Sequence, residues 1–285
     1  MNGVAATRTW QIPKVARWRA ARRTAAFTLG STMLLVVVLA ALFAPLLARH
    51  GPTEQPFRSE QFAPPSWRHP LGVDAVGRDE WTRLLYGARV TLRIAIVATA
   101  IAVVCGIVLG ATAGTLRGFF DIAVAHAVDF LLAFPSILLG LVALTLLTPS
   151  PTSVALAVGV ASLPTVVRQI RAAFVTESAK DYVLAARAIG ASRWRIAVTE
   201  ILPNCASLIL VLTSLTLGSA VLEAAGLSFL GLTGQPDVAE WGMMLREDVG
   251  AFRIAPWLCL APGMAMTWTV LGFNLIGDGL QRGRR

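Results

Sequence analysis

Charge is scarce in this chain of 285 residues. Asp, Glu, Lys and Arg make up only 14% of it, whereas 55% of the residues are hydrophobic and the mean hydropathy is +0.66. A water-soluble globule of this size needs more polar surface than this composition supplies. The composition therefore favours a chain that lies in lipid.

Residues that carry catalytic or metal chemistry are also few. The chain has three histidines and three cysteines, with no Cys-x-x-Cys spacing and no clustered histidines. No Gly-x-x-x-x-Gly-Lys-Ser/Thr phosphate loop, no paired carboxylates and no nucleophile with a base stand out. We therefore expect no catalytic residue, metal ligand or cofactor in this chain, and we expect Cys105, Cys205 and Cys259 to be small core residues.

What the chain does have is long runs without a charge. A helix needs roughly 20 apolar residues to cross a hydrocarbon core of about 30 Å. A proline-containing cluster at 148–152 divides the third run into two, because proline lacks an amide donor and disfavours helix before it. The pattern predicts an all-α integral membrane protein with six transmembrane helices. The uncharged runs lie at 24–48, 94–116, 130–167, 201–222 and 254–277.

These runs divide the chain into five parts. The first run is too long for a cleavable signal, so we expect a retained anchor. The predicted parts are a basic N-terminal arm at 1–24, a first anchor helix at 25–48, an external loop with an interfacial helix at 49–89, a five-helix core at 90–280 and a tail at 281–285.

The distribution of Lys and Arg predicts the orientation. Residues 1–24 contain six basic residues and no acid, which places the N-terminus in the cytoplasm by the positive-inside rule. Six spans return the C-terminus to the same side. The loop at 226–252 is acidic, and the loop at 49–89 is nearly balanced. The net charge of +9 forms no continuous patch with interleaved aromatics, so we expect membrane lipid headgroups rather than nucleic acid as its partner.

Two segments outside the runs have patterns of their own. After a turn-rich opening at 69–79, Trp81, Leu84, Leu85 and Ala88 recur at helical intervals and predict a helix along the outer interface. An ordered external loop is the alternative for this segment.

The second segment, 181–204, lies between the fourth and fifth spans. Ala185 favours helix, Gly190 permits a left-handed ending, Ser192 can cap a second helix and Pro203 can start the fifth span. The pattern predicts a short helix, a turn and a second short helix on the cytoplasmic face. It suits either a knob that the groove of another protein can grip or an ordinary amphipathic interface helix.

Three residues of the spans are candidates for a pore or gate. Asp129 lies three residues after His126, so the two can pair on one helix face; a proton relay and a structural contact are both open. Pro135 can kink the third span, either to shape the pore wall or only for packing. Glu223 is expected at the outer mouth of the pore, as a gate or docking residue.

Segment 181–204 resembles the cytoplasmic signature of the inner-membrane permeases of ATP-binding-cassette (ABC) importers. That signature reads Glu-Ala-Ala, three residues, Gly, nine residues, Ile, one residue, Leu-Pro. Leu184 replaces the acid and Glu200 replaces the Ile, which puts one salt bridge to the ATPase in doubt. The matching positions are Ala185, Ala186, Gly190, Leu202 and Pro203.

Roughly residues 65–280 resemble the branch that serves oligopeptides, dipeptides and nickel, and its C-type subunit in particular. One motif alone would be weak, but their order and spacing together are specific. The similar stretches lie at 69–89, at 134–135 after Asp129, at Arg168 and Arg171, and at 227–232, 241–245 and 274–280.

The resemblance implies a type I ABC importer fold with a coupling helix at 181–194, in a bacterial inner membrane. It also implies a B-type permease partner, two cytoplasmic ATPases that bind ATP and Mg, and an external substrate-binding protein. The chain would then form half of a pathway for oligopeptides or dipeptides; nickel, another small solute and, more distantly, an ion-driven transporter are the alternatives. The residues implied to contact the ATPase are Asp181, Tyr182, Ala185, Ala186, Gly190, Ala191, Trp194 and Pro203.

Overall fold

The computed structural model describes residues 14–231 and 237–282, and these residues form helices and no strand. Short turns join the longer helices, apart from the segment between α9 and α10, part of which lies outside the described residues, and the loop at 48–79. This loop holds one isolated bridge between Val73 and Asp79. The helices are α1 (Lys14–Leu42), α2 (Ala44–Leu47), α3 (Glu80–Leu116), α4 (Gly118–Leu132), α5 (Ser136–Thr145), α6 (Pro151–Glu177), α7 (Asp181–Ala188), α8 (Arg193–Arg195), the π-helix η1 (Ile196–Ile201), α9 (Leu202–Phe229), α10 (Trp241–Asp248), the 3₁₀ turn η2 (Val249–Ala251) and α11 (Pro256–Arg282).

Six membrane spans account for most of the described chain. Five helical segments are long and apolar enough to cross a membrane: part of α1, all of α3 and α6, the continuous segment from α8 to α9, and α11. The pair α4 and α5, which meet at a bend of 94°, is the sixth span when the two helices are counted as one broken span. The prediction of an all-α membrane protein with six transmembrane helices is confirmed, with the third span broken rather than kinked.

The second span differs from its predicted form. We expected a separate interfacial helix before it, but residues 80–89 are the first turns of α3. The Asp79 carboxylate caps this helix by accepting from the Thr82 amide at 3.0 Å, and no breaker interrupts the helix after that point. The Trp81 to Ala88 pattern therefore belongs to a helix that extends beyond the bilayer and is partly buried by the outer loop.

Small residues set the packing of the central helices. Gly106, Gly110 and Gly114 recur every fourth residue on the face of α3 that meets α6. A β-carbon added to Gly110 would lie 2.8 Å from the carbonyl oxygen of Val167, so only glycine permits this approach.

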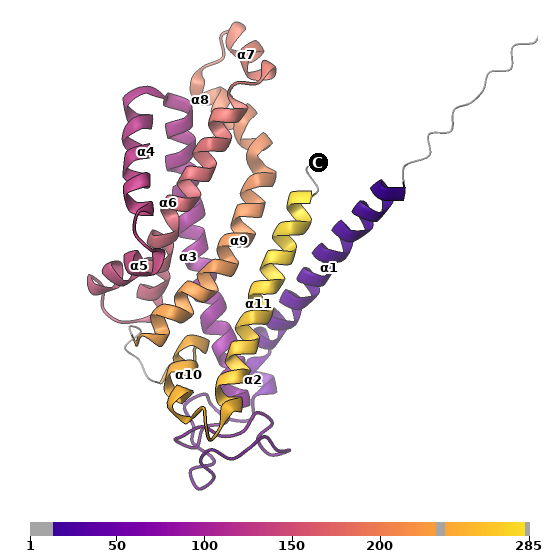
Figure 1. The fold of residues 1–285 in the computed structure, drawn as a ribbon, viewed down its shortest axis with the longest axis vertical. Coiled ribbons are helices and arrows are strands. Elements are labelled where there is room, and N and C mark those ends of the chain that lie inside the picture. The colour runs from indigo at the N-terminus through magenta and orange to yellow at the C-terminus, as the bar shows by residue number, and fades with distance from the viewer. Residues whose placement is uncertain (1–13, 232–236, 283–285) are drawn as a thin grey trace, which may run out of the picture.

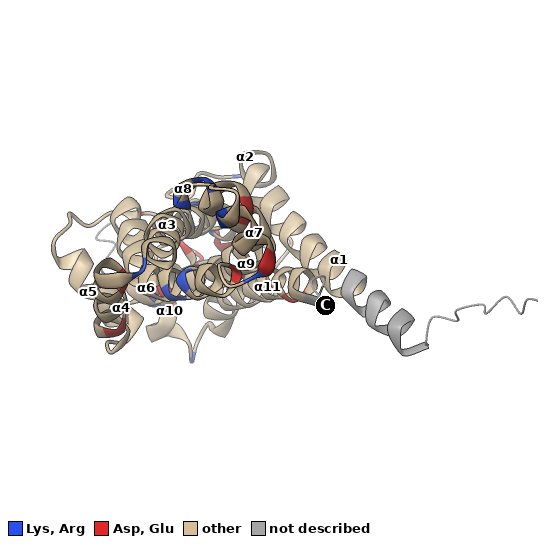
Figure 2. Cartoon of the chain, turned by 90° about the horizontal axis from the view of Figure 1, so that it is seen from above, with Lys and Arg blue, Asp and Glu red and all other residues tan. Residues whose placement is uncertain are grey.

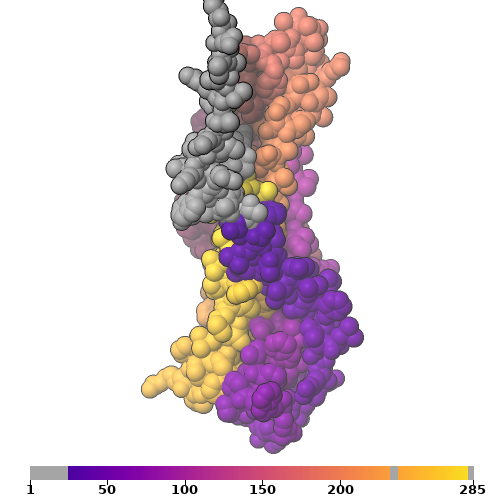
Figure 3. Space-filling view, turned by 90° about the vertical axis from the view of Figure 1, so that its right-hand side faces the viewer, coloured from indigo at the N-terminus to yellow at the C-terminus, as the bar shows by residue number. Residues whose placement is uncertain are grey.

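The two ends of the bundle are built differently (Figure 1). At one end, here called the coupling end, α7 and α8 project beyond the ends of α3, α6 and α9, and α11 finishes on the same side. The opposite end, the loop end, carries the 48–79 loop and α10. The space-filling view shows the α7–α8 region at the upper extremity and the loop covering the lower one (Figure 3).

Candidate functional site

The projecting segment at 181–194 has the form that the sequence predicts. Gly190 comes after α7 with φ +84°, a conformation that residues with a β-carbon rarely adopt. The Ser192 hydroxyl then accepts from the Arg195 amide at 3.3 Å and caps α8, and Pro203 lies in the first turn of α9. The predicted helix, turn and second helix are confirmed.

The surface of this segment is apolar where it is most exposed. Ile189 is 86% exposed and Leu184 about half exposed, although both lie outside the membrane spans, and Trp194 is half exposed at the start of the fifth span. Asp181 and Ala185 are also exposed, whereas Val183 is buried and fixes the base of α7. An exposed apolar knob on a charged surface is typical of a protein docking site.

The remaining residues predicted to contact the ATPase lie at the base of this knob. Ala186 and Ala191 are half-buried, and Tyr182 is half-buried against the end of α6. These side chains are small or already bonded, so they support the exposed face rather than extend it.

Glu177 at the end of α6 anchors α7, and no prediction from the sequence included it. Its buried carboxylate pairs with Lys180 at 2.7 Å and accepts a hydrogen bond from the Tyr182 hydroxyl at 2.9 Å. Burial, together with this carboxylate, raises the pKa of Tyr182 to about 12, so the phenol remains a donor. An acid at the end of a span, three residues before a lysine, is the signal that could have found it.

A second tether at the coupling end joins α4 to α6. Arg171 holds the Asp121 carboxylate with two contacts, at 2.5 and 2.9 Å. Asp129 lies exposed on α4, two turns further along. The predicted pairing of Asp129 with His126 is absent from the described contacts, because His126 Nδ1 bonds instead to the Ile122 carbonyl at 2.8 Å.

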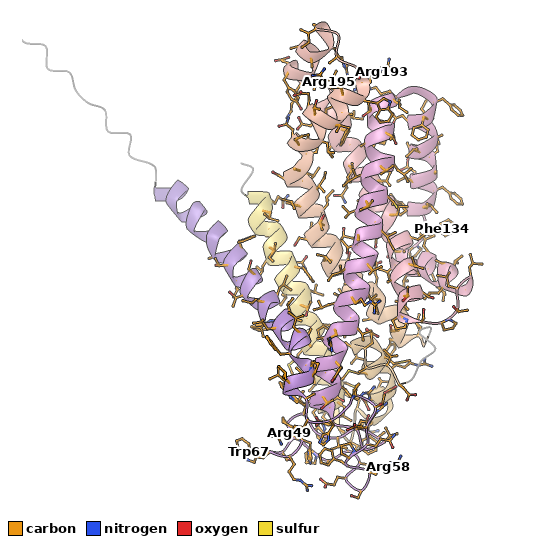
Figure 4. The ribbon with its side chains drawn as sticks, turned by 180° about the vertical axis from the view of Figure 1, so that it is seen from behind. Arg49, Arg58, Trp67, Phe134, Arg193 and Arg195 are labelled. Carbon is orange, nitrogen blue, oxygen red and sulfur yellow. The ribbon has the colours of Figure 1, made fainter. Side chains whose placement is uncertain are left out.

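The other two pore candidates lie close together where α4 and α5 meet. Pro135 ends the break between α4 and α5, at the corner where Phe134 is labelled in Figure 4. Glu223 of α9 lies against this corner and is bonded to the hydroxyls of Ser136 and Ser162, the latter at 3.3 Å. Glu223 therefore connects three helices two turns inside the end of α9, deeper than the predicted outer mouth.

Two families of known proteins match this chain. The family described as the binding-protein-dependent transport system inner membrane component matches residues 106–283, and the N-terminal TM domain of oligopeptide transport permease C matches residues 15–65. The first match alone covers more than half of the chain. The chain belongs to this permease family.

Several curated permeases resemble it over nearly their whole length. The di/tripeptide transport system permease protein DppC of Pseudomonas aeruginosa (strain UCBPP-PA14) is 40% identical over 258 residues, 88% of this chain and 85% of that protein. The dipeptide transport system permease protein DppC of Escherichia coli (strain K12) is 39% identical over 270 residues, 93% of this chain and 90% of that protein. The DppC protein of Alkalihalophilus pseudofirmus is 36% identical over 275 residues, 95% of this chain and 90% of that protein. The resemblance to C-type permeases is confirmed.

The loop end of this permease is held by buried charges. Arg83 lies 3.0 Å from Asp74 and 2.7 Å from Glu247, and Arg78 pairs with the same two acids. Asp74 and Arg83 are each 1% exposed at the side chain. These four residues, here called the outer ion cluster, join the 48–79 loop, α3 and α10 into one unit.

A capping acid fixes the other end of α10. The Glu240 carboxylate accepts from the amides of Gly242 and Met243, both at 3.0 Å, and from the Thr91 hydroxyl of α3 at 3.3 Å. Burial raises the pKa of Glu240, although these hydrogen bonds oppose the shift. α10 is therefore attached to α3 at both of its ends.

A cavity of about 540 Å³ lies towards the loop end between α3 and α6. Arg89 and Arg93, one helical turn apart on α3, line it together with Thr152 of α6. No role for these two arginines was predicted from the sequence. A cavity with paired guanidiniums at the edge of a span can receive an anionic group.

Proposed function

We propose that this permease forms half of the membrane pathway of an ATP-driven peptide importer and is moved by a cytoplasmic ATPase that grips residues 181–194. The observation that carries the proposal is the exposed apolar knob of Leu184, Ile189 and Trp194 above a glycine with positive φ. Such a surface is costly to leave in water, so it requires a partner.

The positive-inside rule supports a cytoplasmic position for this knob. Residues 14–24 carry five of the arm's six basic residues, and the α1 helix that they begin runs from the coupling end. Seen from that end, α8 is marked by basic residues (Figure 2). The loop at 237–248 at the opposite end is acidic. In this orientation, α7 faces a cytoplasmic ATPase and α10 faces an external binding protein.

The contacts around α7 provide a route for motion into the bundle. Glu177 connects α7 to α6, and η1 connects the coupling segment to α9 without a loop. A π-helix in that position is a local irregularity of the kind often found at functional sites. Because α6 and α9 meet again at Ser162 and Glu223, beside the α4–α5 corner, closure of the ATPases would shift both helices as one rigid body.

Peptides are the substrate class that the relatives support. The relatives described above are named as permeases of dipeptide or di/tripeptide transport systems. Nickel remains the second candidate, and the test is uptake by the assembled transporter of a labelled dipeptide in competition with nickel. The ATP and Mg belong to the ATPase subunits, and a B-type permease supplies the other half of the pathway.

The test of the coupling role is Gly190→Phe in the assembled transporter. Among the described residues, no atom lies within 4 Å of a β-carbon added at Gly190. The change therefore strains the backbone turn there and enlarges the surface offered to the ATPase. Loss of a docking hot spot costs about 2 kcal/mol or more, so co-purification of the ATPase should fall by roughly thirtyfold, with loss of uptake.

Gly118→Phe is the matched control. Gly118 also has a positive φ of +69° and nothing within 4 Å, but it lies at the α3–α4 corner. It should retain the ATPase. Wild-type ATPase retention and uptake in Gly190→Phe would contradict the proposal.

A further inference from the structure

A second cavity, of about 400 Å³, opens at the coupling end between the α3–α4 corner and the coupling segment. Three arginines from separate places in the chain line it: Arg117 at the corner, Arg187 on α7 and Arg193 on α8. Figure 4 shows Arg193 nearer the end of α3 than its neighbour Arg195, which lines a different recess.

The positive charge of this cavity is not neutralised by the described residues. None of the three arginines forms an ion pair with them, and the cavity wall contains no acid. Within the part of the chain that the structure describes, the Arg117 guanidinium donates only to the Ser178 hydroxyl, at 2.7 Å. Glu177, an acid at this end of the bundle, is already engaged by Lys180 and Tyr182.

One further group in the wall has an unmet hydrogen bond. The hydroxyl oxygen of Thr115 is buried and has no hydrogen-bond partner among the described residues. Three guanidiniums and a spare hydroxyl in one cavity suit the oxygens of a phosphate group.

The position of the cavity relative to the membrane indicates which molecule supplies that phosphate. The uncharged run of α3 from 94 to 116 has 23 residues and is about 34 Å long, just enough to cross the hydrocarbon core. Arg117 therefore lies at the level of the lipid headgroups. Leu116 in the cavity wall is 36% exposed, and Phe119 in the first turn of α4 is 87% exposed, so apolar side chains are available to acyl chains at this corner.

We propose that this cavity binds the phosphate headgroup of an anionic phospholipid of the leaflet at the coupling end, with the acyl chains along Leu116 and Phe119. The bound lipid bridges the end of α3 and the coupling segment, since residues of both line this cavity. It therefore stiffens the base of the knob. Arg187 and Arg193 belong to the same segment, 181–194, as the exposed Leu184, Ile189 and Trp194, so the test below measures lipid binding on the chain alone, without an ATPase.

The test is native mass spectrometry of the full chain in detergent, titrated with phosphatidylglycerol or with phosphatidylcholine. Wild type should retain phosphatidylglycerol in preference to phosphatidylcholine. In Arg117→Gln/Arg193→Gln, affinity for phosphatidylglycerol should fall by roughly thirtyfold, since two basic contacts are lost. Arg195→Gln removes one neighbouring charge outside the cavity and should bind as wild type does.

Three results would overturn the site. One is equal retention of phosphatidylglycerol by the double variant and by Arg195→Gln. Another is full displacement of the lipid by inorganic phosphate at equal concentration, which would indicate a free-anion site. The third is unchanged lipid binding with loss of ATPase co-purification in the double variant, which would assign the arginines to the protein partner.

Discussion

At the residue scale, buried charge at the loop end determines how the 48–79 loop and α10 are held. The outer ion cluster contains two arginines and two acids, and further acids lie beside it, including the buried Asp248. Buried charges are stable only when paired, and removing one partner from such a network costs about 3 to 5 kcal/mol. The surplus of acid over base means that one carboxyl here is most stable when neutral.

Outside the membrane spans, Asp248 is the carboxyl whose neutral form is most clearly favoured. Burial raises its pKa to about 7, an effect that the repulsion of Asp74 and Glu247 strengthens and the attraction of Arg83 and Arg78 opposes. Because the folded chain holds this proton above the usual pKa of 3.8, the contribution of Asp248 to stability is greatest below about pH 4 and is lost as the pH rises towards 7.

Asp248→Asn should therefore reduce the pH dependence of stability. Between about pH 5 and pH 8, the thermal unfolding midpoint of the wild type in detergent should fall as the pH rises. The midpoint of the variant should fall less. The difference between the two corresponds to up to a few kcal/mol of unfolding free energy. Asp237→Asn, an exposed acid of the same region, should keep the wild-type slope. Parallel slopes for Asp248→Asn and wild type would contradict the assignment.

The sequence predicted the roles of single residues where those roles depend on residues nearby in the chain. Gly190, Ser192 and Pro203 end or begin helices as their backbone preferences require. Arg78 and Glu247 are 169 positions apart, and no local pattern pairs them. The outer ion cluster could be found only once the fold was known.

At the element scale, the uncharged runs located the spans but not all of their limits. α4 begins at Gly118, well before the uncharged run at 130, because Asp121 is neutralised by Arg171 of a neighbouring helix. The break at Pro135 is a bend of 94° with two free helix ends, one of which meets Glu223. A proline in the sequence predicts an interruption but does not determine its angle.

The contact of α10 with α9 offers a prediction at this scale. A β-carbon on Gly242 would lie 2.5 Å from both the α-carbon and the carbonyl oxygen of Ala225, and backbone atoms cannot rotate away. Gly242→Ala should therefore destabilise the fold by roughly 1 to 3 kcal/mol through overpacking, seen as a lower thermal unfolding midpoint.

Gly250→Ala is the control for that change. Gly250 lies in η2, a few residues away, and a β-carbon there meets nothing within 4 Å. Its midpoint should remain close to that of the wild type. An unaltered midpoint in Gly242→Ala would show that α10 does not pack on α9 as described.

At the scale of the whole molecule, the chain is a bundle with two unlike ends. The loop end is fixed internally by the outer ion cluster and Glu240, whereas the coupling end exposes an apolar knob and a basic cavity. Composition and charge-free runs were enough to predict the fold class. In lipid, a spanning segment must satisfy its backbone hydrogen bonds internally, which leaves few structures besides a helix. The arrangement of α10 and the outer loop depended on tertiary contacts and was not predicted.

The central claim is that the knob of residues 181–194 faces the cytoplasm, where an ATPase can grip it. The direct measurement is labelling of single cysteines with a membrane-impermeant maleimide in intact cells whose outer membrane is permeable, after replacement of Cys105, Cys205 and Cys259. Trp67→Cys, at a site 98% exposed at the loop end, should label in intact cells. Ile189→Cys should label only after the inner membrane is opened; labelling of Ile189→Cys in intact cells would contradict the account.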